Sequence, residues 1–141
     1  MASPEFESDK EFRSAMDQVF TLMSDDPEMG PKLRDANVPQ RFEFDDVDLV
    51  LNVRAGEDGE DNLVWEWSDD VSWEPKVRMT MSSVIANKYF QGKENVAIAI
   101  ARRRIKTGGD VKAALALIPI TKPVYDMYRE WVQAEHPHLL V

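Results

Sequence analysis

The chain has 141 residues, of which 43% are hydrophobic and 30% are charged, and its net charge is −9 at neutral pH. This length and composition fit one soluble globular domain, while the acidic balance argues against nucleic acid as a partner and against adsorption to anionic membranes. Because the chain contains no cysteine, disulfides, thiolate nucleophiles and zinc–thiolate sites are excluded.

The N-terminal segment has no basic stretch followed by an apolar one, so it is not a signal peptide. We expect a single domain over residues 1–141, with residues 1–7 a disordered or added leader, and a cytoplasmic location by default. Ser8 and Glu11 have the spacing of a capping box. The apolar stripe that follows predicts a helix ending near residues 25–27, and a shorter helix is expected around residues 31–36.

Residues 40–81 alternate between apolar and polar side chains with a period of two. Four segments carry this pattern, around residues 40–44, 49–54, 63–67 and 76–81. Such alternation is typical of an antiparallel sheet covered on one face only. The acidic connections 45–48 and 56–61 are expected to be solvated turns rather than calcium sites, because they lack the spacing of an EF-hand.

Helical periodicity returns after Met81. We expect a helix capped by Ser82 or Ser83 and stopped by Gly92, and then a second helix over residues 96–101 that is apolar all round and therefore buried. Residues 102–107 suggest a last strand, 108–109 a turn, 110–118 a helix ended by Pro119, and the residues after 121 a final helix. Strands before helices, without strict alternation, indicate an α+β fold with helices on one sheet face.

Four motifs in this order resemble the sterol carrier protein type 2 (SCP2-like) lipid-binding domain family, over roughly residues 38–125. The first is the strand that enters a helix, Val77–Ser82. Next come Gly92-Lys93-Glu94-Asn95, then Ile105, Lys106, Gly109 and Asp110, then the leucine-rich helix Ala113–Ile118. The resemblance implies a mixed, mostly antiparallel five-stranded sheet with helices packed on one face, enclosing an apolar tunnel.

The same resemblance implies a non-catalytic protein that binds or transfers a fatty acid, a fatty acyl-CoA or a sterol. No catalytic residue, cofactor or metal ligand is carried over from it. The residues expected to line or close the tunnel are apolar and aromatic, although each could also be ordinary core: Met79, Met81, Ile85, Tyr89, Phe90, Val96, Ile100, Ala114, Leu117, Ile118, Tyr125, Tyr128 and Trp131. We expect them to border one continuous apolar space.

A basic cluster and a pair of histidines are the remaining candidate sites. Arg102–Arg104 with Lys106 forms either a solvated strand edge or a contact for a lipid carboxylate or coenzyme A phosphate at the tunnel mouth. His136 and His138 lie near the C-terminus, and two histidines without a third ligand do not predict a metal site.

Two other function classes stay open beside the lipid carrier. A protein-interaction module or accessory subunit would expose Trp65, Trp67 or Trp73 as an apolar patch. An enzyme acting on a hydrophobic substrate would place a carboxylate with a raised pKa inside the pocket.

Overall fold

The computed structural model of the protein describes residues 6–141. Residues 1–5, which make up most of the expected leader, lie outside the described residues. Phe6, which also belongs to the expected leader, is buried, and its ring lies 5.0 Å from the ring of Phe12. The elements are α1 (Asp9–Asp25), α2 (Met29–Ala36), β1 (Gln40–Phe44), β2 (Leu49–Ala55), β3 (Leu63–Trp67), β4 (Val77–Met81), α3 (Ser83–Phe90), α4 (Val96–Ala101), β5 (Lys106–Gly109), α5 (Val111–Ala116), α6 (Ile118–Thr121), α7 (Val124–Glu135) and the 3-10 turn η1 (Pro137–Leu139).

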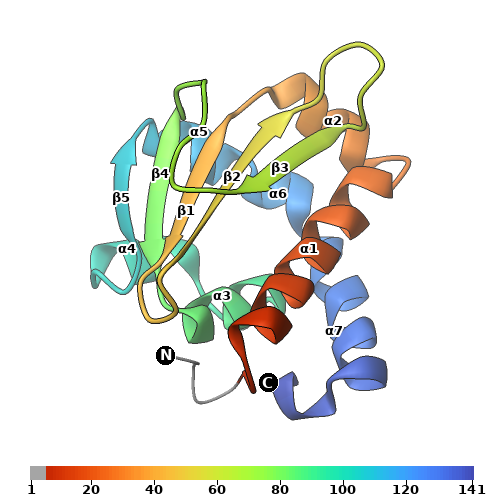
Figure 1. Cartoon of the computed structure of the whole chain (residues 1–141), viewed down its shortest axis with the longest axis vertical. Helices are drawn as coiled ribbons and strands as arrows, with labels where there is room; N and C mark the ends of the chain where they lie inside the picture. Colours follow the sequence, from red (N-terminus) through yellow and green to blue (C-terminus); the bar gives the residue numbers. More distant parts are fainter. Residues whose placement is uncertain (1–5) are drawn as a thin grey trace.

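The strands form one five-stranded sheet in the order β3-β2-β1-β4-β5 (Figure 1). Three neighbouring pairs are antiparallel, and β1 runs parallel to β4, so that Phe42 lies opposite Leu51 on one side and Met79 on the other. This is the mixed, mostly antiparallel sheet that the sequence resemblance implies.

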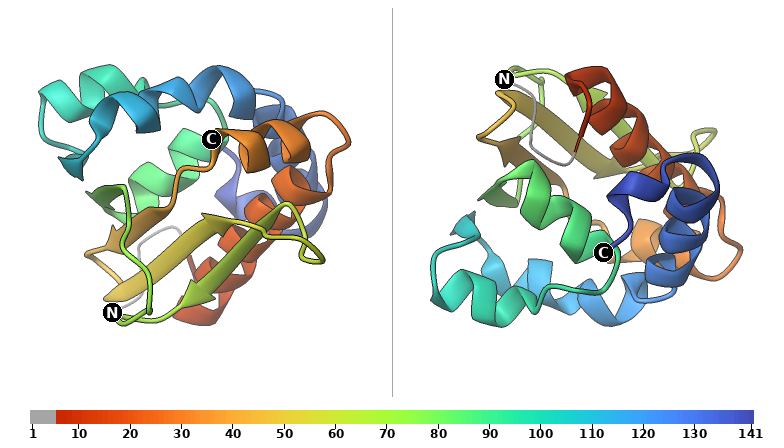
Figure 2. Two further views of the ribbon diagram at one scale, coloured as in Figure 1. Left: turned by 90° about the horizontal axis from the view of Figure 1, so that it is seen from above. Right: turned by 90° about the horizontal axis from the view of Figure 1, so that it is seen from below.

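The two faces of the sheet differ in chemistry. Phe42, Leu51 and Met79 point into the buried face, which faces the helices, and Figure 2 shows α3, α4 and α5 gathered on one side of the sheet. The opposite face is crossed by the β3–β4 connection, residues 68–76, which Figure 1 shows passing over β2 and β1. There the side chains of Asn52 and Arg41 donate to backbone oxygens of that connection, at 2.6 and 2.9 Å.

The helix caps follow the sequence pattern. The Ser8 hydroxyl accepts from the Glu11 N–H at 3.1 Å, and Ser82, Asn95 and Asp110 cap α3, α4 and α5 in the same way. Each cap satisfies a backbone donor that the first helical turn leaves free. Within residues 6–141, no helix is long and apolar enough to cross a membrane.

The prediction that residues 96–101 are buried all round is wrong. Only Val96 and Ala99 of α4 are buried, and the Ile98 side chain is 46% exposed. A six-residue helix has one face toward the protein, and α4 lies at the outside of the helical layer, so its other apolar side chains meet solvent.

The strand predicted over residues 102–107 is also misplaced. Arg102–Arg104 form a turn that closes α4, in which Arg103 adopts a left-handed backbone with φ 59° and Arg104 N–H donates to Ala99 O at 2.8 Å. The strand begins at Lys106, so Gly108 and Gly109 pair with β4 instead of forming a turn. The arginines therefore belong to a helix end and not to a strand edge.

Pro119 does not end the helix that Asp110 begins. That helix, α5, stops at Ala116, and Pro119 lies in the first turn of α6. A proline is tolerated there because the first turn of a helix needs no N–H from that position. The result is two short helices in place of one.

Candidate functional site

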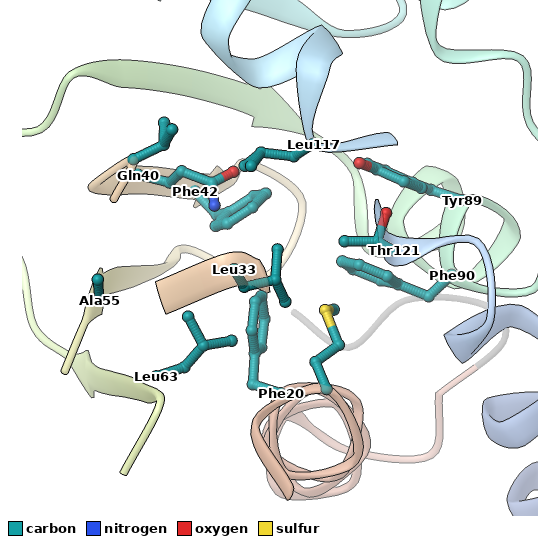
Figure 3. Close-up of a pocket in the computed structure, with 12 residues that line it drawn as sticks. Phe20, Leu33, Gln40, Phe42, Ala55, Leu63, Tyr89, Phe90, Leu117 and Thr121 are labelled. Carbon is teal, nitrogen blue, oxygen red and sulfur yellow. The ribbon is translucent and has the colours of Figure 1, made fainter. Parts of the chain in front are cut away.

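A small, mostly apolar cavity lies between the buried sheet face and the helices (Figure 3). It is lined by residues from α1, α2, the first three strands, α3 and the α5–α6 segment. These residues are Phe20, Met23, Leu33, Val38, Gln40, Phe42, Ala55, Leu63, Tyr89, Phe90, Leu117 and Thr121.

Phe20 joins the two sides of this cavity. Its ring lies 5.8 Å from the ring of Phe42 on the sheet and 5.9 Å from that of Phe90 on α3. Edge-on and tilted contacts at these distances are favourable for aromatic pairs. The aromatic side chains thus form a wall that connects α1 with the sheet and α3.

Helix α3 is fixed over the sheet at its N-terminus. The carboxylate of Asp46, in the β1–β2 turn, accepts from the Ser83 N–H at 2.7 Å and from the Ser83 hydroxyl at 2.6 Å. At the other end, Gly92 has φ +74°, a conformation that glycine adopts without strain. Tyr89 and Phe90, on the last turn of α3, are placed at the cavity by these two ends.

Three of the lining side chains are polar, and all three are neutral: Gln40, Tyr89 and Thr121. Burial raises the pKa of the Tyr89 phenol above its ordinary value, so the phenol stays protonated at neutral pH. The twelve residues that line the cavity include no side chain that is charged at neutral pH. Such a lining suits the hydrocarbon part of a ligand. An ionised head group would have to stay in contact with solvent, because burying an unpaired charge there costs free energy.

The cavity volume is about 30 Å³. About 10–15 Å³ suffices for one water molecule, whereas sites for small-molecule ligands are typically about 300–1,000 Å³. A ligand of lipid size therefore requires the walls to move apart. The α5–α6 segment is short and buries few side chains, which are Ala114 in α5, Thr121 in α6 and Leu117 between them.

The residues expected to line a tunnel divide into two groups. Tyr89, Phe90 and Leu117 meet at the cavity. Of the remaining ten, Met79, Met81, Val96, Ala114 and Tyr128 are buried in the core, and Ile85, Ile100, Ile118, Tyr125 and Trp131 are half-buried against it. A role for this second group in contacting a ligand stays a prediction.

Nine lining residues were not among the expected ones, and most lie before β4 in the chain. The apolar stripe of α1 contains Phe20 and Met23, and the strand alternation contains Phe42 and Leu63. Both patterns signal burial, but they do not show that α1 and β1–β3 enclose the same space as α3. Leu33 and Val38 carry no pattern that could have singled them out.

The arginine cluster is remote from this lining. None of Arg102–Arg104 is among the twelve lining residues, and Arg104 pairs with Glu94 at 2.8 Å. Two of the three tryptophans considered for an exposed patch are bonded to α1: the indole N–H groups of Trp65 and Trp67 both donate to Asp17 Oδ1, at 3.0 and 2.8 Å. These bonds pack β3 against α1. Trp73 is half-buried in the β3–β4 connection.

No protein-family model and no curated protein sequence matches the chain. Solved structures do match. Sterol carrier protein 2 from Yarrowia lipolytica superposes with a TM-score of 0.56 at 15% identity, over 89% of this chain and 97% of that one. The ubiquinone synthesis protein UbiJ-SCP2 gives 0.59 at 10% identity, over 80% and 94%. The chain has an SCP2-like fold.

Part of a larger chain also matches this fold. The inverting sec-alkylsulfatase Pisa1 from Pseudomonas sp. matches with a TM-score of 0.60 at 15% identity, over 74% of this chain. The match covers only 16% of the alkylsulfatase chain. Identities this low show a shared fold and carry no residue-level function.

Proposed function

We propose that this protein binds or transfers one apolar lipid, a fatty acid, a fatty acyl-CoA or a sterol, between its sheet and its helices, without catalysing a reaction on it. The observation that carries the proposal is the uncharged, mostly apolar cavity at that place in an SCP2-like fold. Its lining suits hydrocarbon, and each methylene removed from water contributes about 0.8 kcal/mol. A long chain therefore needs no strong polar anchor.

The lipid enters by displacement of the α5–α6 segment, which covers the cavity through Leu117 and Thr121. Short elements that bury few side chains open at the lowest free-energy cost. Once the segment has moved, the cavity extends as a tunnel toward Met79, Met81 and Ile85, where the core is apolar. The neutral groups Gln40 and Tyr89 then orient the polar end of the lipid.

The other two function classes have less support. An interaction module built on exposed tryptophans conflicts with the bonds of Trp65 and Trp67 to Asp17. An enzyme needs a general acid, a base or a nucleophile at the substrate, and the cavity lining offers neutral side chains with a protonated phenol. We accordingly propose a cytoplasmic carrier whose partner is a lipid rather than nucleic acid.

Displacement of a fluorescent fatty acid tests the proposal. The wild-type protein should bind the probe saturably with one site per chain, and unlabelled fatty acid should displace it. L117W places a larger side chain into the space that the lipid would occupy. It should weaken binding about tenfold or more, which is a loss of about 1.4 kcal/mol of binding free energy.

The matched control is I98W, which introduces the same side chain on the exposed face of α4. It should bind the fluorescent fatty acid as the wild-type protein does. Far-UV circular dichroism establishes that both variants are folded, and A55L fills the cavity more mildly if L117W is unstable. Absence of saturable binding by the wild-type protein, or equal binding by L117W and I98W, would refute the proposal.

A further inference from the structure

Glu11 and the two histidines of the chain come together at the junction of the two chain ends. Oε2 of Glu11 lies 3.1 Å from His136 Nδ1, and Oε1 lies 3.0 Å from His138 Nε2. One donor atom from each of the three residues lies within 4.8 Å of the others. We propose that this Glu11–His136–His138 cluster binds a divalent transition-metal ion such as Zn²⁺.

The cluster is assembled from distant parts of the sequence. Glu11 lies in the first turn of α1, and Figure 1 shows the C-terminal end of the chain beside that turn. His136 follows α7 directly, with its N–H bonded to Val132 O at 2.8 Å, and His138 lies in η1. Their rings are 5.9 Å apart between centroids, so both reach the same carboxylate.

The separations fit a metal site. Zn²⁺ binds histidine nitrogen and carboxylate oxygen at about 2.0–2.2 Å, which places two tetrahedral ligands about 3.3–3.6 Å apart. His136 Nδ1 lies 3.1 Å from Oε2 of Glu11 and His138 Nε2 lies 3.0 Å from Oε1, so each ring faces a different oxygen of the carboxylate. One ligand atom from each residue lies within 4.8 Å of the others, and a shared ion would require the three side chains to draw together by about 1 Å toward tetrahedral separations. Two imidazoles with one carboxylate suit Zn²⁺ and its neighbours in the first transition row, and suit Ca²⁺ and Mg²⁺ poorly.

The residues around the cluster hold it in place. The Glu7 N–H donates to Glu11 Oε1 at 2.9 Å, the kind of second contact that orients a ligating carboxylate. Leu139, next to His138, is fully buried, and its carbonyl accepts from Asn87 and Gln91 at 2.8 Å each. The tail that carries both histidines is therefore anchored before any ion binds.

The exposure of the side chains leaves a path for the ion. The Glu11 side chain is 9% exposed, whereas those of His136 and His138 are 26% and 38% exposed. On binding, each ring nitrogen that faces Glu11 donates its lone pair to the ion. A neutral ring keeps its single proton on its other nitrogen, and a ring that was protonated releases one proton to solvent. The bound ion then links α1 to the C-terminal tail, independently of any lipid in the cavity.

Calorimetric titration of the full chain with ZnCl₂ tests the inference, at about pH 8 because metal ions compete with protons for the ligand atoms. We expect one saturable site per chain. Co²⁺ in place of Zn²⁺ should give the visible absorption of a nitrogen- and oxygen-ligated ion, and Zn²⁺ should displace it. The unfolding temperature should rise with increasing free Zn²⁺.

H138N and H136N should each weaken Zn²⁺ binding at least tenfold. E135Q, which removes an exposed carboxylate at the end of α7, should leave binding unchanged and serves as the control. H138N changes the most exposed of the three side chains, and unfolding in chelator shows whether its fold is intact. The absence of saturable heat would overturn the inference. Zn²⁺ binding that both histidine variants retain would also overturn it, because the ion would then be bound elsewhere on the protein.

Discussion

The amide of Asn87 is a buried polar group that makes three hydrogen bonds in the helical layer. Its nitrogen donates to Leu139 O at 2.8 Å, and its oxygen accepts from Tyr128 at 3.0 Å and Gln91 at 2.9 Å. Asn87 itself is fully buried. Buried hydrogen bonds of this kind are costly to break, because the partner groups stay behind without solvent. Asn87 thus joins α3, α7 and the C-terminal tail.

N87A should lower the free energy of unfolding by about 1–3 kcal/mol, because it removes an amide that bonds Leu139 O and the Tyr128 hydroxyl inside the core. Urea denaturation followed by circular dichroism measures the change. Q133A, an exposed position on α7, should alter the free energy by less than about 0.5 kcal/mol. An equal, small effect of both substitutions would mean that Asn87 does not hold the tail.

At the scale of elements, the β2–β3 connection is closed by a bidentate ion pair. Arg54 donates to both carboxylate oxygens of Glu60, at 2.9 Å each, and the Glu57 N–H donates to the same carboxylate at 3.0 Å. Gly56 is required there, since a Cβ atom would lie 1.7 Å from Asp61 O. The connection is acidic in sequence but is ordered by two arginines, since Arg34 also donates to Glu57 O at 2.6 Å and to Glu60 O at 3.1 Å.

The Arg54 side chain lowers the pKa of Glu60 to about 2 from its ordinary 4.5. A lowered pKa in the folded state means that the pair stabilises the fold above about pH 4.5 and loses that effect as the pH falls toward about 2. Carboxyl ¹³C NMR titration should find the low value in the wild type and a return toward the ordinary value in R54Q. R102Q, which changes an exposed arginine elsewhere, should leave it low. An unshifted Glu60 pKa in the wild-type protein would show that the pair does not form.

The sequence predicts the helices and strands whose ends are marked by residues close together in the chain, such as helix caps. Ser8, Ser82, Asn95 and Asp110 cap helices where the sequence places them, because a cap needs a side chain and a backbone N–H three residues on. The end of α4 and the start of β5 were not predictable in this way. Gly109 can pair with β4 because it has no Cβ, which would lie 2.4 Å from Lys76 O. That contact joins segments far apart in the chain.

At the scale of the whole molecule, the cavity is a product of long-range packing. The sequence pattern indicated α+β topology and a buried sheet face, but α1 and α2 had no signal connecting them to α3 and α6. Leu33, Leu63 and Leu117 meet only because the sheet, α2 and the α5–α6 segment converge. The expected lining was therefore centred on β4 and the later helices, while the observed cavity lies nearer α1 and β1.

The most direct measurement is photo-crosslinking of the full chain with a fatty acid that carries a diazirine at its terminal carbon, followed by peptide mass spectrometry. We predict one label per chain, in the segments that carry Phe20, Phe90 and Leu117, and loss of the label when unmodified fatty acid is in excess. Labels confined to the exposed Ile98 face of α4, or labels that unmodified fatty acid does not compete away, would contradict lipid binding between the sheet and the helices.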